Sequence, residues 1–227
     1  MSRLKLYDIV CESRDMFEGF DETELTEEYP TDFDISKFKI LPSYAAKLRY
    51  AEEHLGKPIG RGSSRVVYRV DENKVLKLAK NRRGVAQNEV EIDWAGDGYY
   101  ESIVANIFDF DRYDHLWVEM ELAIRAKPTD FRRLWGVEQQ YLDLYLLNKD
   151  VENRGRRSPF YLDEPIQKKL DENDNVQLLI SFMLDSDSPA NDLGRISSWG
   201  IVKRNGKDHL VLIDFGLTNE VYDTYYH

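Results

Sequence analysis

The hydrophobic and polar residues of this chain alternate with two different periods. Residues 59–70 predict a glycine-interrupted strand that turns and returns as β-branched sequence. After a tight turn at Asp71–Asn73, residues 74–78 alternate with a period of two and predict the next strand. Two more strands are expected near Ala105–Phe110 and His115–Leu122, with a turn at Asp111–Asp114 between them. The first part of the chain therefore predicts an antiparallel sheet.

Apolar residues at helical spacing surround these strands. Ser43 is a candidate N-cap and Gly56 a candidate end for a helix whose apolar positions are Tyr44, Leu48, Ala51 and Leu55. Further helices are expected over Val85–Trp94, near Val137–Leu144 and Pro165–Leu170, and as a core helix over Val176–Leu184. The pattern as a whole predicts an α+β protein.

The last strong strand runs from Leu210 to Ile213 and ends in Asp214-Phe215-Gly216. It is expected to pair with Trp199–Lys203 around a turn at Arg204–Lys207. An acid at the end of a buried strand can hold a divalent cation, and Phe215 can lock the turn into the core. On its own this pattern also fits an ordinary strand and turn.

Composition excludes several classes of protein. No stretch among the 227 residues approaches the roughly 18 apolar residues of a membrane span, and the N-terminus lacks the apolar core of a signal peptide, so we expect a cytoplasmic protein without a membrane partner. The single cysteine, Cys11, excludes an internal disulfide and a cysteine-cluster zinc site. The net charge of −11 disfavours nucleic acid as a partner.

Two features of the predicted sheet favour a phosphate ligand. Gly60 and Gly62 would let the backbone approach a phosphate, and Val67 would press on a flat ligand beneath. Lys77 shares a side of its strand with Val75 and needs an acidic partner if it is buried. We expect that partner to be Glu89, on the apolar face of the following helix, with Glu91 as the alternative.

Together these motifs resemble the eukaryotic-like protein kinase family. The residues stand in the order of that family: Gly60-Arg61-Gly62 with Val67, Lys77, Glu89, the connector Met120–Ala123, and Asp214-Phe215-Gly216. The resemblance covers residues 55–125 and, less fully, 176–218. It implies a two-lobe fold, with an N-lobe of antiparallel sheet and one helix and a reduced, mostly helical C-lobe.

The expected domains follow from this resemblance and from charge. Residues 1–41 form an acidic arm, since Glu12–Asp34 holds ten acids and one base. Residues 42–123 form the N-lobe with its leading helix, and residues 124–227 form the C-lobe.

The resemblance also implies ATP and Mg²⁺ as cofactors and gives the site residues their roles. Asp192, in Ala190-Asn191-Asp192-Leu193, looks like the catalytic acid, with Lys77 on the α- and β-phosphates and Glu89 fixing that lysine. Asp214 is the expected metal ligand, and Ser197 falls where the family has a second, with Ser198 as the other alignment. The adenine would lie beneath Ile59, Val67 and Val75 and bond the backbone between Glu121 and Ala123, next to Met120.

Three departures from the family pattern affect what is expected. Arg65 replaces the third glycine of the loop, and a serine replaces the metal-binding asparagine. No Ala-Pro-Glu follows Gly216, so we expect the peptide-substrate platform to be missing. In this shortness the chain is similar to the compact kinase-like proteins of bacteriophages.

Three functions are compatible with these residues. The first is an ATP- and Mg²⁺-dependent phosphotransferase that acts on Ser or Thr of a protein. The second is a pseudokinase scaffold that binds a partner protein through its acidic arm and short lower lobe. The third is a small-molecule kinase of related fold, whose acceptor needs no peptide platform.

Overall fold

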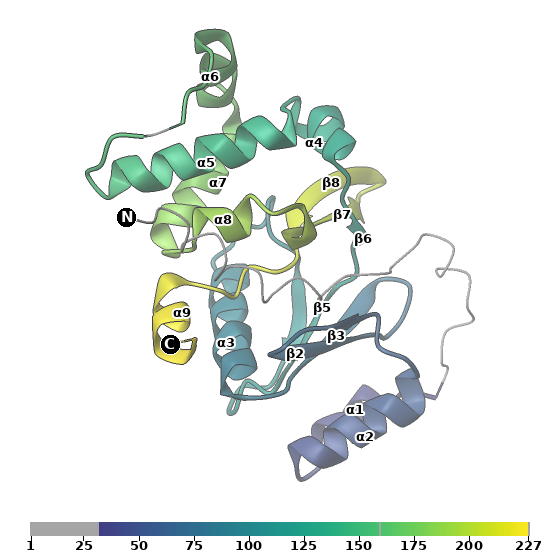
Figure 1. Cartoon of the computed structure of the whole chain (residues 1–227). Coiled ribbons are helices and arrows are strands. Elements are labelled where there is room, and N and C mark those ends of the chain that lie inside the picture. The colour runs from purple at the N-terminus through teal and green to yellow at the C-terminus, as the bar shows by residue number, and fades with distance from the viewer. Residues whose placement is uncertain (1–31, 159, 227) are drawn as a thin grey trace. The chain divides into compact units, whose positions relative to one another are not determined.

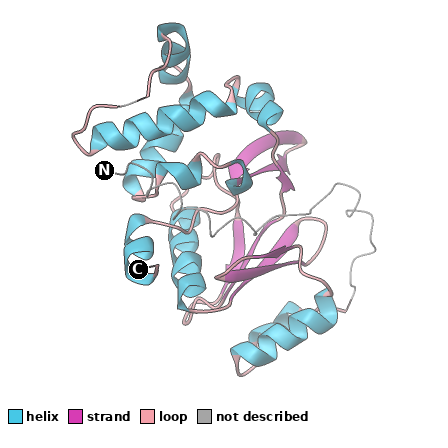
Figure 2. Ribbon diagram, in the orientation of Figure 1, coloured by secondary structure: helices cyan, strands magenta, loops and turns pink. Residues whose placement is uncertain are grey.

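The computed structural model describes residues 32–158 and 160–226, and these form a mixed α+β structure, as the sequence predicts (Figures 1 and 2). Their contacts divide the chain into two compact units. Unit 1 contains the described residues up to Asn88 and residues 108–122, and unit 2 contains residues 89–107 and the described residues from Ala123 onward. The predicted boundary after residue 123 lies next to one of these divisions, but residues 89–107 belong to unit 2 rather than to the first unit.

Unit 1 is built on a sheet with the strand order β1-β2-β3-β5-β4. Figure 1 labels three of its strands, β2, β3 and β5. The neighbours β1 and β2, β2 and β3, and β3 and β5 run antiparallel. The strands are β1 (Gly60–Arg61), β2 (Arg65–Arg69), β3 (Lys74–Ala79), β4 (Ile107–Phe110) and β5 (Trp117–Glu121). Both predicted tight turns are present, and in each the first residue, Asp71 or Asp111, accepts hydrogen bonds from backbone N–H groups two or more residues ahead.

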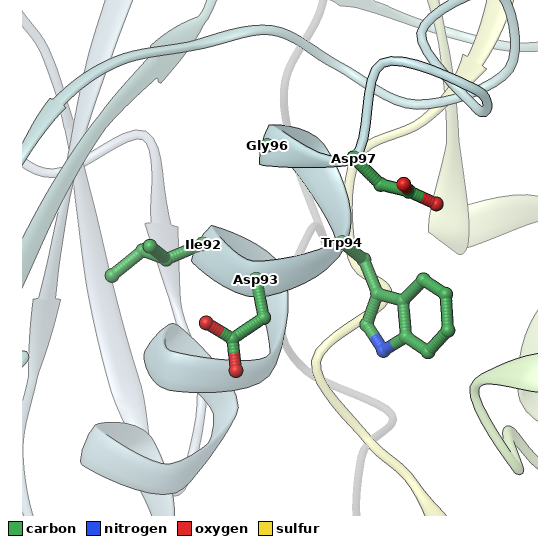
Figure 3. Close-up of a pocket in the computed structure, with 5 residues that line it drawn as sticks. All are labelled: Ile92, Asp93, Trp94, Gly96 and Asp97. Carbon is green, nitrogen blue, oxygen red and sulfur yellow. The ribbon is translucent and has the colours of Figure 1, made fainter.

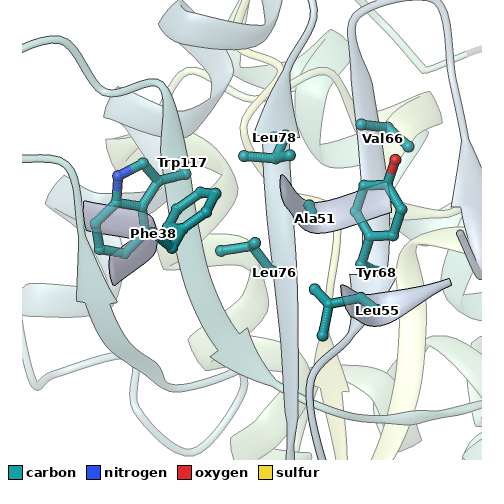
Figure 4. Packing of buried hydrophobic residues seen from close by; sticks show 8 residues of the cluster. All are labelled: Phe38, Ala51, Leu55, Val66, Tyr68, Leu76, Leu78 and Trp117. Carbon is teal, nitrogen blue, oxygen red and sulfur yellow. The ribbon is translucent and has the colours of Figure 1, made fainter. Parts of the chain in front are cut away.

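One face of this sheet carries the hydrophobic cluster shown in Figure 4. Helices α1 (Ile35–Lys39) and α2 (Tyr44–Leu55) pack against that face. The cluster consists of side chains from both helices and from three strands: Phe38, Ala51, Leu55, Val66, Tyr68, Leu76, Leu78 and Trp117. Because side chains alternate along a strand, the residues between these strand positions lie on the opposite face.

Helix α2 has the two ends that the sequence predicts. The Ser43 hydroxyl accepts a hydrogen bond from the Ala46 N–H at 3.2 Å, and Gly56 closes the helix with a φ of 71°. The positive φ explains why glycine stands at the end of the helix.

Helix α1 was not predicted, and it begins inside the expected acidic arm. Asp34 caps it by accepting hydrogen bonds from the N–H groups of Ser36 and Lys37. The Phe38 ring is 0% exposed and meets the Trp117 ring edge-on, with 5.6 Å between centroids. Unit 1 therefore begins before residue 42, and the remainder of the expected arm, residues 1–31, lies outside the described residues.

Helix α3 (Arg82–Gly96) contains the division between the units, which falls after Asn88. Unit 2 otherwise consists mainly of helices and a sheet with the strand order β6-β7-β8 (Figure 1). The helices of unit 2 are α4 (Pro128–Trp135), α5 (Gln139–Asn153), α6 (Glu164–Asp171), α7 (Asp174–Asp185), α8 (Ala190–Leu193), the 3₁₀ turn η3 (Ile196–Ser198) and α9 (Asn219–Tyr225). The strands are β6 (Ile124–Arg125), β7 (Trp199–Arg204) and β8 (Lys207–Leu212).

The predicted hairpin is present as β7 and β8, with Trp199 opposite Leu212. Its two-residue turn is Asn205-Gly206, and both residues have positive φ values, of 51° and 75°. Such a turn matches the twist of the paired strands and is specific to Asn-Gly and similar pairs. The turn fixes the register that brings Asp214 to the end of β8.

The predicted core helix is present as α7, with Asn173 as its N-cap. Val176, Leu179 and Met183 are buried as expected. Leu184, however, is 40% exposed, and Phe182 is buried instead. Phe182 contacts other aromatic rings of unit 2.

Helix α4 was not predicted, although the sequence contains a signal for it. Pro128 occupies the first turn, where its missing N–H costs nothing, and Gly136 ends the helix with a φ of 72°.

Among the helices of residues 32–158 and 160–226, none combines the length and apolar character that crossing a bilayer requires.

Alkaline pH is expected to destabilise unit 2 through Tyr145 on α5. Burial, and then the hydrogen bond that the Tyr145 hydroxyl donates to Asp171, raises the pKa of Tyr145 to about 12. Because this pKa lies above its unfolded value of about 10, the stabilisation is fully present below pH of about 10 and is lost as the pH rises through about 12. Denaturant unfolding measured from pH 8 to 12 should show that the free energy of unfolding falls less with rising pH for Tyr145→Phe than for the wild type. A Tyr161→Phe control, at an exposed position, should follow the wild type; equal slopes for all three proteins would contradict the prediction.

Candidate functional site

In unit 1, the predicted glycine-rich loop is a tight turn between β1 and β2. Gly60 pairs with Val67, and the Gly62 N–H donates to the Arg65 carbonyl at 2.9 Å. Ser63 and Ser64 therefore form the tip of the turn. The N–H of Ile59 also donates to Val67, at 2.9 Å, so the expected loop is continuous with the sheet.

The sheet face opposite the hydrophobic cluster carries four of the predicted nucleotide contacts. Lys77 lies directly across from Val67, and Val75 lies directly across from Met120. Residues that face each other directly in an antiparallel pair project their side chains to the same side of the sheet. Because Lys77 and Val75 are two residues apart, all four side chains share one face. Each of them is buried, and the Lys77 side chain is only 3% exposed.

Arg61 does not share that face. It pairs with Val66, a member of the hydrophobic cluster, and its guanidinium lies 3.7 Å from the Glu52 carboxylate of α2. The Arg61 side chain thus points away from the face of Lys77, and only its backbone remains a candidate for contact with a phosphate.

The predicted connector Met120–Ala123 is engaged with its neighbours at two points. The Leu122 N–H donates to the Asn73 carbonyl at 2.7 Å within unit 1. In unit 2, Ala123 packs so closely on Gly200 that a Cβ at Gly200 would lie 2.5 Å from the Ala123 methyl. Glu121 is half-buried and lies across from Lys74.

In unit 2, Asp192 lies on the one-turn helix α8. Its side chain is 13% exposed, and its Oδ1 lies 3.5 Å from an Arg195 guanidinium nitrogen. Three successive carbonyls at this helix end each accept a side-chain hydrogen bond at 2.7 Å. The donors are the Ser198 hydroxyl to Asp192, the Trp199 indole to Leu193, and the Gln139 amide to Gly194. These bonds satisfy carbonyls that a helix end leaves without backbone partners, and they fix the backbone of Asp192.

Ser198 also connects Asp192 to the strand that ends at Asp214. Its carbonyl accepts a hydrogen bond from the Ile213 N–H at 2.8 Å, while its hydroxyl bonds to the Asp192 carbonyl. One buried residue thus joins the two segments that carry the predicted acids. Sequence reasoning treated Ser198 only as an alternative metal ligand and missed this role, as it missed Gln139.

The acid of α3 that is buried is Glu91 and not Glu89. Glu91 is 0% exposed and its Oε1 accepts a hydrogen bond from the Phe215 N–H at 3.3 Å, whereas Glu89 is exposed. The prediction that Glu89 occupies the buried face is therefore wrong. The prediction assumed that the buried face of α3 is apolar. That face instead carries three buried polar residues, Gln87, Asn88 and Glu91.

Phe215 is buried, as the sequence predicts, within a group of aromatic side chains in unit 2. Its ring lies 6.0 Å from that of Phe182, which in turn lies 5.7 Å from Trp94 and 5.2 Å from Tyr100. All three contacts are edge-on, which is a favourable arrangement for aromatic pairs. The turn that follows Asp214 is thereby held by its side chain and by its backbone.

Replacing Glu91 with alanine is expected to destabilise the protein by about 1–3 kcal/mol, because the buried Phe215 N–H would lose its acceptor. The matched substitution Glu89→Ala, at an exposed position of the same helix, should change the free energy of unfolding by no more than about 0.5 kcal/mol. Urea denaturation of both variants measures the difference. A larger loss for Glu89→Ala than for Glu91→Ala would contradict this assignment.

In unit 2, the predicted metal ligand Asp214 offers one carboxylate for a metal ion. Within residues 32–158 and 160–226, no three His, Cys, Asp or Glu side chains cluster as a metal site. Mg²⁺ does not need such a cluster, since one or two carboxylates and the oxygens of a substrate phosphate can hold it. Asp214 is half-buried at the end of β8 and can supply such a carboxylate. Ser197 is half-buried in η3, while the Ser198 hydroxyl donates its hydrogen to Asp192.

Two hollows in the structure are lined by other residues. One, of about 490 Å³, lies at the C-terminal end of α3 and is open to solvent (Figure 3). It is lined by Ile92, Asp93, Trp94, Gly96 and Asp97. The other, of about 470 Å³, lies beside α6. Neither is lined by a residue predicted to contact a nucleotide or metal.

Comparisons with known proteins find no similar family for this chain. No protein-family model matches it, and no curated protein sequence matches it either. The functional interpretation therefore depends on the residues and contacts described above.

Proposed function

We propose that the protein is an ATP- and Mg²⁺-dependent phosphotransferase of the protein kinase type that phosphorylates Ser or Thr of a protein. The observation that carries this proposal is the connection through Ser198, which joins the Asp192 segment to the strand ending at Asp214. A phosphoryl transfer site needs an acid for the acceptor hydroxyl and an acid for the metal near one phosphoryl group. In this proposal, units 1 and 2 are the N-lobe and the C-lobe of a kinase-like fold.

The residues of unit 1 would bind the nucleotide. Gly60 and Gly62 would contact its phosphates through the backbone, and the Lys77 ammonium would contact the α- and β-phosphates. Val67, Val75 and Met120 share the face of Lys77 and would contact the adenine ring. The support for these roles is the common face of the four side chains.

The residues of unit 2 would carry out the transfer. The Asp192 carboxylate would accept the proton of the Ser or Thr hydroxyl whose oxygen attacks the γ-phosphorus, while the bond from the γ-phosphorus to the bridging β,γ-oxygen breaks and ADP leaves with that oxygen. The Asp214 carboxylate would hold the metal. When bound, Mg²⁺ neutralises charge on the phosphate oxygens. We propose that Glu91 orients the Asp-Phe-Gly segment, because Glu91 is buried and bonds to Phe215. The acid that fixes Lys77, expected to be Glu89 with Glu91 as the alternative, stays a prediction.

One observation favours a second function, a pseudokinase scaffold that binds a partner protein. The hydroxyl hydrogen of Ser198 is donated to a backbone carbonyl. In the alignment that places the family's metal-binding asparagine at Ser198 rather than Ser197, the residue at that position therefore serves the fold. Without a side-chain ligand at that position, a second Mg²⁺ would be held weakly or through water. A scaffold could bind nucleotide, or none, without transferring phosphate.

A transfer assay distinguishes these functions. The purified protein is incubated with Mg²⁺ and γ-labelled ATP, alone and with cell lysate, beside the Asp192→Ala and Lys77→Ala variants. Labelled protein that disappears with both variants supports the proposed kinase. Labelled small molecules indicate the small-molecule kinase, and nucleotide binding without transfer indicates the scaffold.

A further inference from the structure

The turn proposed to cover the phosphates is bonded to the segment that follows β3. All three carbonyls of Gly62, Ser63 and Ser64 accept hydrogen bonds from this segment. The donors are the Lys80 ammonium to Gly62 at 2.8 Å, the Asn81 amide to Ser63 at 3.0 Å, and the Lys80 N–H to Ser64 at 2.7 Å. The turn is thus hydrogen-bonded to Lys80 and Asn81 in addition to the bonds of the hairpin formed by β1 and β2.

A buried side-chain bond connects the same turn to helix α3. The Ser64 hydroxyl donates to the Gln87 Oε1 at 2.7 Å, and the two residues are only 4% and 6% exposed. A buried hydroxyl without an acceptor would be costly, so this bond is a strong local constraint. Both residues belong to unit 1.

Gly84 shows how closely the first turn of α3 approaches this loop. A Cβ at Gly84 would lie 2.2 Å from the Ser64 carbonyl oxygen and 3.0 Å from the Ala79 Cα. Both neighbours are backbone atoms and cannot rotate away, so only glycine fits. The close approach is what allows Gln87, one turn further along α3, to reach the Ser64 hydroxyl.

We propose that Gln87 is a positioning residue that fixes the turn Gly62–Arg65 for binding the nucleotide phosphates. A turn that is ordered before binding loses less conformational entropy when a phosphate binds to its backbone. Glu91 lies four residues after Gln87 and therefore on the same side of α3, where it bonds to Phe215. This inference rests on the proposed nucleotide site.

The test compares ligands with and without phosphates. Calorimetry measures the affinity of ATP with Mg²⁺, and of adenosine, for the wild type and for Ser64→Ala and Gln87→Met. Gln87→Met keeps the length of the side chain but removes the acceptor. We expect the affinity for ATP to fall by about 5- to 30-fold in both variants, as the loss of one buried hydrogen bond implies. The affinity for adenosine should stay unchanged, because adenosine lacks the phosphates that the turn is proposed to contact.

Three controls separate a positioning role from a structural one. Gln167→Met makes the same chemical change at an exposed position of α6 and should bind both ligands as the wild type does. The double variant Ser64→Ala/Gln87→Met should lose no more ATP affinity than either single variant, because all three lack the same bond. Thermal melting confirms folding, and Ser64→Ala provides the result if Gln87→Met does not fold.

Three outcomes would overturn the inference. If the wild type binds ATP and both single variants bind it equally well, Gln87 does not position the turn, and the proposed kinase function stands. If the variants lose affinity for adenosine and ATP to the same extent, the loss reflects general loss of structure, and Gln87 again does not position the turn. If the wild type binds neither ATP nor adenosine, the proposed nucleotide site itself is wrong.

Discussion

Replacing Asp192 with asparagine is expected to lower phosphoryl transfer by about 100- to 10,000-fold while leaving the affinity for ATP within a few-fold of the wild type. Asparagine keeps the size of the side chain and its place on α8, but it cannot accept the proton of the acceptor hydroxyl. The effect should therefore appear in kcat and not in nucleotide binding. Transfer from γ-labelled ATP and calorimetric titration with ATP measure the two quantities separately.

Asp114→Asn provides the matched control for this prediction. Asp114 is an exposed acid in the turn between β4 and β5, and it is not part of the proposed site. The control should transfer phosphate at the wild-type rate. Transfer by Asp192→Asn at the rate of the control would contradict the role of Asp192 as the acceptor's acid.

Replacing Trp199 with alanine is expected to destabilise the protein by about 3–5 kcal/mol, the range for truncating a large buried aromatic residue. Trp199 is 0% exposed and packs edge-on against Phe131 and Trp135, with ring centroids 5.4 and 5.0 Å away. Its indole also donates to the Leu193 carbonyl, next to Asp192. The variant would lose this packing and one of the three bonds that fix the end of α8. Urea unfolding, followed by circular dichroism, measures the loss.

Trp199→Phe separates the two contributions of this residue. Phenylalanine keeps most of the aromatic packing but lacks the indole N–H, so the loss should be clearly smaller than for alanine. Equal losses for the two variants would show that the bond to Leu193, rather than the packing, dominates. A loss below about 1 kcal/mol for Trp199→Ala would contradict the position of Trp199 in the core of unit 2.

Local signals in the sequence predicted the elements that have distinct ends. Helix α2 was predicted from its N-cap Ser43 and from Gly56 at its C-terminal end. The strands of unit 1 were predicted with small errors at their boundaries, because turns that begin with Asp71 and Asp111 separate them. The hairpin of β7 and β8 was also predicted, because its strands are apolar and its turn is polar. Helix α1 was missed because it has only five residues, too few to show a helical period.

The candidate site was predicted less evenly. Lys77, Val67, Val75 and Met120 do share one buried face, since strand alternation and register fix which side chains project together. Glu91 could not be preferred over Glu89, because apolar periodicity says nothing about a helix whose buried face is polar. The roles of Ser198 and Gln139 were missed for a similar reason: each forms a hydrogen bond to a backbone carbonyl, which leaves no pattern in the sequence.

The sequence by itself determined the alternation of strands and helices, the turn chemistry and the order of the candidate motifs, because these depend on interactions between residues close together in the chain. Only the tertiary structure decided that Glu91 is buried against Phe215, that Ser198 joins the segments of Asp192 and Asp214, and that Gln87 bonds to Ser64. These contacts connect residues 6 to 124 positions apart. Each of these contacts is made by a buried polar group that needs a hydrogen-bond partner. Which partner is within reach depends on how whole helices and strands pack, and local sequence does not specify that packing.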